Sequence, residues 1–111
     1  MEGLIKALIK QPGRDAAEIT IGNDLKSLQG AVGGYIEDVN MRGVPFVRII
    51  VDEEGKLKRK QPNVALERDI LVGTILVVGC QEDQEEFISL TEQQLSDAKA
   101  WLAERAIKGG V

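Results

Sequence analysis

The stretch IGNDLKSLQGAVGGYIEDV, residues 21–39, carries the signals for a strand end, a short helix and a second strand. Asn23 or Asp24 can cap the helix, because a short side-chain oxygen accepts the unpaired N–H groups of the first helical turn. The apolar residues at positions 25, 28 and 32 share one helical face. Gly33 and Gly34 supply the positive φ that ends a helix. The stretch therefore predicts a helix followed by a strand at residues 35–39.

The segment that precedes this stretch predicts two strands. Residues 4–9 carry apolar side chains on both faces, which is typical of a strand inside a sheet. The sequence Gln-Pro-Gly-Arg at 11–14 predicts a turn, because proline fixes φ and glycine permits a positive φ. Residues 18–21 then form a short second strand.

The segment that follows it predicts further strands. Residues 46–51 are rich in β-branched side chains, and an acidic turn with a positive φ at Gly55 leads to a return arm at 56–60. Residues 62–66 predict a tight turn or a single helical turn. The most apolar run is 70–79, where Gly73 interrupts and leaves 74–78 as a central strand buried on both faces.

The last element is a predicted helix that begins after Thr91 and runs to about Ile107, with Gly109 as its stop. Thr91 and Gln94 match a capping box. The core stripe of this helix comprises Leu95, Ala98, Leu102 and Ala106. We predict an α+β fold, a single compact domain over 1–111: a mixed, mostly antiparallel sheet of about five strands, a short helix after the second strand and a longer C-terminal helix.

Composition limits the function classes. The chain has 111 residues, of which 43% are hydrophobic and 29% charged, as in a soluble globular domain. Its net charge of −4 argues against general nucleic-acid binding. It contains one cysteine and no histidine, which excludes an internal disulfide and an imidazole base, and the single cysteine favours a reducing, cytoplasmic setting. No stretch reaches the ~20 apolar residues that span a bilayer.

Several pieces resemble a family of small uncharacterised domains encoded mainly by bacteriophages and other mobile elements. The more specific pieces are Val-Gly-Gly-Tyr-Ile-Glu at 32–37 and Pro-Asn-Val-Ala-Leu at 62–66. Pieces at 21–25, 28–29, 52–57, 70–73 and 77–79 follow the family's order and extend the resemblance over most of 4–90. The resemblance implies a phage or mobile-element origin and an α+β fold. It implies no reaction and no catalytic residue.

One candidate ligand site combines a ring, a carboxylate and an amide. Tyr35 and Glu37 share a strand face, and Asn63 sits in the predicted turn, so the three could hold a small ligand. Arg42 and Arg48 would then be the charge partners of a phosphate. The alternative is that Tyr35 packs with its hydroxyl at the surface, Glu37 is solvated and Asn63 stabilises its own turn.

Other motifs have structural explanations. The glycines at 30, 33 and 34 follow a helix, whereas the glycines of a phosphate loop precede one. We interpret the basic run at 56–60 as a solvated arm that protects a strand edge; the alternative is a surface that contacts phosphates or an acidic partner.

Trp101 lies at the edge of the helical stripe. It either completes the core or anchors a partner together with Ile107. Phe46 and Phe87 are predicted core residues.

These observations lead to an expected function without catalysis. We expect a small cytoplasmic binding protein of a phage or mobile element in a bacterial host, with no cofactor and no metal, that inhibits host defence by sequestering a nucleotide-derived signal or a host protein. We expect it to form a homo-oligomer. The alternatives are a protein–protein adaptor or structural oligomer, and a small hydrolase that depends on carboxylates or lysine.

Overall fold

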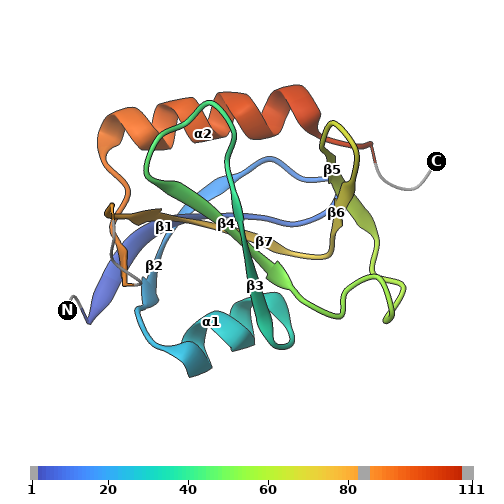
Figure 1. Cartoon of the computed structure of the whole chain (residues 1–111), viewed down its shortest axis with the longest axis horizontal. Coiled ribbons are helices and arrows are strands. Elements are labelled where there is room, and N and C mark those ends of the chain that lie inside the picture. The colour runs from blue at the N-terminus through green and yellow to red at the C-terminus, as the bar shows by residue number, and fades with distance from the viewer. Residues whose placement is uncertain (1–2, 83–85, 109–111) are drawn as a thin grey trace.

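Two helices cover opposite faces of one antiparallel sheet in the computed structural model, which describes residues 3–82 and 86–108 (Figure 1). In chain order the elements are β1 (Leu4–Lys10), β2 (Ala17–Gly22), α1 (Leu25–Val32), β3 (Ile36–Asn40), β4 (Val47–Asp52), β5 (Pro62–Ala65), β6 (Ile70–Val72), β7 (Ile75–Cys80), β8 (Phe87–Ile88) and α2 (Glu92–Arg105).

The main sheet has the order β2-β1-β7-β4-β3, and each of these neighbouring pairs is antiparallel. The short strand β8 adds to the end of β7, at Gly79 and Cys80. A separate two-stranded sheet is formed by β5 and β6. The predicted α+β class is confirmed, with β1 and β7 inside the sheet as their apolar sequences indicated.

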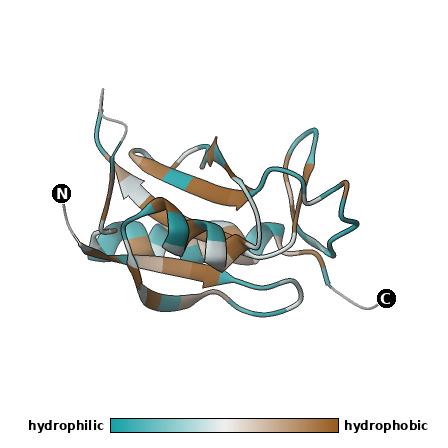
Figure 2. Ribbon diagram, turned by 90° about the horizontal axis from the view of Figure 1, so that it is seen from below, coloured by the Kyte–Doolittle hydropathy of each residue, from teal (hydrophilic) through white to brown (hydrophobic). Residues whose placement is uncertain are grey.

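Alternation along the strands divides the hydrophobic core into two layers. Ile49 and Val77 belong to the layer under α2, whereas Ile50 and Leu76 belong to the layer under α1. Successive strand residues point to opposite faces, so neighbours in sequence enter different layers. Figure 2 shows the hydrophobic colour concentrated on the strands and the hydrophilic colour on the loops.

Both ends of α1 and the start of α2 follow the local signals. Asp24 is the N-cap of α1, and its side chain accepts a hydrogen bond of 2.8 Å from the Ser27 N–H. Asn23 instead donates its amide to the Phe87 carbonyl. Gly33 has a φ of 84° and donates its N–H to the Gln29 carbonyl, as a left-handed C-cap does. The capping box at the start of α2 is also present.

Three predictions downstream of β4 are wrong. Residues 53–59 form consecutive turns and no return arm, because both edges of β4 already pair with β3 and β7. The left-handed residue of this segment is Arg59, with a φ of 57°, and not Gly55. Residues 62–65 form the strand β5, where a turn or helical turn was predicted, because they pair with β6.

The other differences concern element ends. The helix α2 ends at Arg105 because the chain leaves it to pair with β5: Ala106 bridges Val64 and the Ile107 N–H donates to the Asn63 carbonyl. Ala106 is consequently exposed and not in the core stripe. The predicted stop at Gly109 lies outside the described residues. Phe46, predicted in a strand and in the core, precedes β4 and is 52% exposed.

Candidate functional site

A cleft of about 930 Å³ lies between the loop that joins β3 to β4, the turn that joins β5 to β6, and the last turns of α2. Three arginines line it, one from each of these segments: Arg42, Arg68 and Arg105. We call it the arginine cleft. It brings together two of the residues singled out from the sequence, Arg42 and Trp101, which are far apart along the chain.

Trp101 contacts the backbone of Arg42 and the side chain of Arg105. It is 7% exposed, and its indole Nε1 donates a hydrogen bond of 2.9 Å to the Arg42 carbonyl, which ties the β3–β4 loop to α2. The Arg105 guanidinium lies over the indole ring, 4.2 Å from its centroid, and donates to the Trp101 carbonyl. A cation over an indole face is attracted by the ring quadrupole. Trp101 is therefore a core residue that also orients the Arg105 guanidinium.

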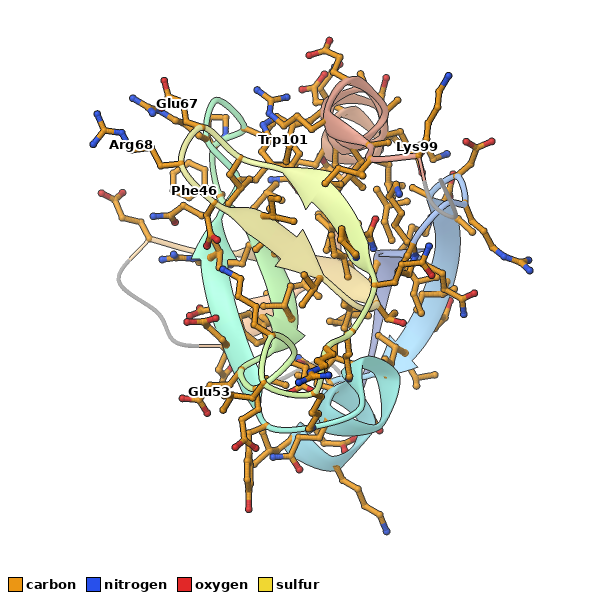
Figure 3. All side chains as sticks on the ribbon, turned by 90° about the vertical axis from the view of Figure 1, so that its right-hand side faces the viewer. Phe46, Glu53, Glu67, Arg68, Lys99 and Trp101 are labelled. Atoms are coloured by element: carbon orange, nitrogen blue, oxygen red, sulfur yellow. The ribbon has the colours of Figure 1, made fainter. Side chains whose placement is uncertain are left out.

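The two carboxylates in the cleft wall are already paired. Glu67 accepts from Arg42, and Asp69 accepts from Lys56. The hydrogen bond from Lys56 holds the pKa of the Asp69 carboxyl below its ordinary value. Within residues 3–82 and 86–108, Arg68 forms no ion pair, and Figure 3 shows its side chain extending outward beside Glu67. The cleft thus offers cations on a chain whose net charge is −4.

A second cleft, of about 730 Å³, lies between the β3–β4 loop and the end of β7. Asn40, Phe46, Arg48 and Cys80 contribute to its wall, and we call it the phenylalanine cleft. The Arg48 guanidinium donates to the Asn40 side chain. Arg48 is half-buried on the interior strand β4, directly opposite Asn40 on β3.

The predicted group of Tyr35, Glu37 and Asn63 does not form a site. Asn63 is fully buried: its amide donates to the carbonyls of Lys10 and Gly73 at 2.8 Å, and its oxygen accepts from Lys10 Nζ at 2.6 Å. A ligand at the surface cannot reach this side chain, because the fold uses its hydrogen-bonding groups. Burial lowers the pKa of the Lys10 ammonium, and Asp15 partly opposes that effect.

Tyr35 and Glu37 lie at the surface near β3. Tyr35 directly precedes the strand, is 66% exposed, and accepts the Glu53 N–H at its carbonyl. Glu37 is exposed on the strand itself. Neither residue lines the arginine cleft or the phenylalanine cleft. The two arginines predicted as phosphate partners therefore stand in different surroundings from the predicted ring and carboxylate.

The basic run at 56–60 has a structural role that neither sequence interpretation anticipated. Lys58 and Lys60 each place Nζ 2.7 Å from the Asp52 carboxylate, and they donate to the Gly33 and Val32 carbonyls at the end of α1. We call Asp52, Lys58 and Lys60 the lysine clamp. Lysines near a helix C-terminus satisfy its unpaired carbonyls and its negative dipole end.

Sequence reasoning missed three cleft residues. Arg105 follows Trp101 by four positions, a spacing that places two helical residues side by side, so this pair could have been found. Arg68 and Phe46 had no comparable signal, because their surroundings come from segments distant in sequence. Ile107, proposed with Trp101 as a partner anchor, is half-buried and attached through its N–H to β5.

The chain was also compared with known proteins. No helix among the described residues is long and apolar enough to cross a membrane. No curated protein and no solved structure matches the chain. A family model does match, over residues 5–103. The chain is therefore a member of the DUF3846 family, a domain of unknown function.

Proposed function

We propose that the protein is a non-catalytic binding protein that takes up a small anionic, nucleotide-like ligand in the arginine cleft. The observation that carries the proposal is that three arginines from three separate segments line one cleft, whose wall also contains the buried Trp101. The volume of about 930 Å³ is in the range of small-molecule sites.

The chemistry of the arginine side chain supports a phosphate-bearing ligand. A planar guanidinium donates two parallel hydrogen bonds to phosphate oxygens and stays charged at any physiological pH. Arg68 is exposed and is available to an incoming anion without breaking an ion pair to any described residue. Arg42 would exchange its surface pair with Glu67 for the ligand, and an exposed pair of this kind contributes little stability.

The biological setting of the proposal rests on the sequence resemblance. We propose that this phage or mobile-element protein acts in the bacterial cytoplasm. By binding a nucleotide-derived signal it would inhibit a host defence without catalysing a reaction. A host protein is the alternative target.

Self-association also belongs to the proposal. The strand β2 forms an edge of the sheet, and Leu4 and Leu25, which lie near the end of β2, are 64% and 57% exposed. Native mass spectrometry of the purified protein would report both a retained ligand and the assembly.

The direct test is titration with ADP and with pyrophosphate, followed by calorimetry and by fluorescence. Trp101 is the sole tryptophan, so its emission reports on the arginine cleft. We expect saturable binding that weakens with added salt. Arg68→Gln and Arg42→Gln should each weaken binding by roughly tenfold or more, because a hydrogen bond to a charged group contributes about 1.5–3 kcal/mol.

Lys99→Gln is the matched control, because it removes one positive charge elsewhere on the molecule. Lys99 pairs with Glu18, and Figure 3 places it on the side opposite Arg68. If Lys99→Gln weakens binding as much as Arg68→Gln does, the effect is one of net charge and the cleft is not the site. Absence of saturable binding to either anion in the wild type would reject the proposal.

A further inference from the structure

Phe46 presents its ring to solvent from a strained backbone. Its φ is 60°, a value that bulky side chains rarely adopt. The ring is 52% exposed, whereas the flanking apolar residues Val44 and Val47 are 9% and 3% exposed. The segment therefore buries its small apolar side chains and leaves its large one outside, the reverse of what the hydrophobic effect favours.

Hydrogen bonds from two other elements hold this conformation. The Phe46 carbonyl accepts the Cys80 N–H from β7 at 2.9 Å. The Gln94 side-chain amide reaches the carbonyls of Pro45 and Phe46 at 3.3 and 3.4 Å, while its oxygen completes the capping box of α2. Strained residues persist where the surrounding structure over-determines them, and they gather at ligand sites. The same α2 terminus thus caps a helix and fixes the Phe46 backbone.

The ring stands beside polar groups in the wall of the phenylalanine cleft. Arg48 and Asn40 lie in the same cleft and form a hydrogen-bonded pair. A guanidinium can donate hydrogen bonds to the edge of a heterocycle, and an amide can both donate and accept them. An aromatic face with hydrogen-bonding groups at its side is the arrangement that proteins use to hold unstacked bases.

We propose that the phenylalanine cleft is a second binding site, which stacks a planar heteroaromatic ring of the nucleobase class on Phe46, with Arg48 and Asn40 at the ring's polar edge. The cleft volume of about 730 Å³ accommodates such a ring. This site does not depend on anion binding in the arginine cleft. Its ligand is recognised through a π-face and ring-edge hydrogen bonds, so a neutral nucleoside is sufficient.

The experiment is titration of the full chain with adenosine, with ribose as the matched probe that lacks the base. Aromatic carbon–proton NMR spectra of phenylalanine-labelled protein report on Phe46, because the only other phenylalanine is Phe87. We expect adenosine to shift the Phe46 resonances saturably and ribose to leave them unchanged. Trp101 emission should stay constant, since Trp101 lines the other cleft. No saturable shift with adenosine would overturn the proposal.

Substitutions at Phe46 separate stacking from packing. Phe46→Gly should weaken adenosine binding by about tenfold or more while leaving the thermal midpoint unchanged or raised, because glycine accepts a positive φ. Phe46→Tyr should retain binding. Phe46→Leu should lose adenosine binding as Phe46→Gly does. If Phe46→Leu still bound adenosine, the contact would be a general apolar one, which would contradict stacking on the ring. A large fall in the midpoint of Phe46→Gly would show a structural ring and would also reject the site.

Discussion

At the scale of single residues, the buried carboxylate of Asp52 is the most consequential charge in the molecule. Its side chain is 1% exposed and lies between the two ammonium groups of the lysine clamp. Burial alone would raise its pKa, but the hydrogen bonds from Lys58 and Lys60 outweigh burial and lower the pKa to about 2. A carboxyl group with a depressed pKa stabilises the folded state only while it is ionised.

The expected consequence is a loss of stability in acid. The contribution of Asp52 is complete above a pH of about 5 and is lost as pH falls through 3.8 and on through the folded-state pKa of about 2. It amounts to about 2 kcal/mol by the linkage of pKa to free energy. Urea unfolding followed by Trp101 fluorescence should therefore show Asp52→Asn less stable than wild type at pH 7 and nearly equal at pH 2.

The neighbouring Glu53→Gln is the control for this measurement, since Glu53 is exposed. It should follow the wild-type pH dependence. If Asp52→Asn and wild type lose stability in parallel between pH 4 and pH 2, the lysine clamp does not act through the ionisation of Asp52.

At the scale of elements, α1 shows why two glycines stand together. The helix has eight residues, fewer than an isolated helix needs in water, so tertiary contacts must hold it. Gly33 provides the left-handed cap. Gly34 provides space: a Cβ there would lie 2.6 Å from both the Asp52 carboxylate and Lys58 Nζ. Gly33 ends the helix, and Gly34 leaves the space in which the lysine clamp packs against the helix end.

Alanine substitutions inside α1 and just after its C-cap should therefore have opposite effects. Gly34→Ala should lower the free energy of unfolding by about 1–3 kcal/mol, because it forces the lysine clamp apart. Gly30→Ala should raise it by about 0.5–1 kcal/mol, because Gly30 is exposed within the helix and a Cβ there meets no atom within 4 Å. Thermal and urea unfolding of both variants test the pair. A Gly34→Ala variant as stable as the wild type would show that the lysine clamp tolerates a Cβ at this position.

At the scale of the whole molecule, Asn63 connects the small sheet to the main sheet and to the end of α2. Its side-chain amide donates to the carbonyls of Lys10, at the end of β1, and of Gly73, which precedes β7. Its backbone carbonyl accepts the Ile107 N–H just after α2. The buried ammonium of Lys10 completes the connection. The small sheet is therefore fastened to the main sheet by hydrogen bonds that water does not reach.

A double-mutant cycle measures this connection. Asn63→Ala should cost at least about 2 kcal/mol, because it leaves the buried Lys10 ammonium and two backbone carbonyls without their donor or acceptor. Combined with Lys10→Met, the loss should be smaller than the sum of the single losses, with a coupling of about 1–3 kcal/mol. The measurement is urea unfolding of all four proteins; strict additivity would mean that the two side chains act independently.

The sequence by itself determined the elements whose causes are local. The helix at 25–32, its cap at Asp24, its stop at Gly33 and the capping box at Thr91 depend on dihedral angles and hydrogen bonds within a few residues. Apolar side chains on both faces likewise identified the interior strands β1 and β7. These features needed no knowledge of what packs against them, because the interacting groups are neighbours in the chain.

Tertiary structure decided everything that joins distant segments. The basic run became a helix clamp because Asp52 is buried beside it, and residues 62–65 became a strand because β6 offered a partner. The arginine cleft exists only where two loops meet α2, so Arg42 and Trp101 were identified separately and not as one site. Long-range pairing depends on which strand edges and which charged groups still lack a partner after the local elements have formed. A pattern within a few residues does not contain that information.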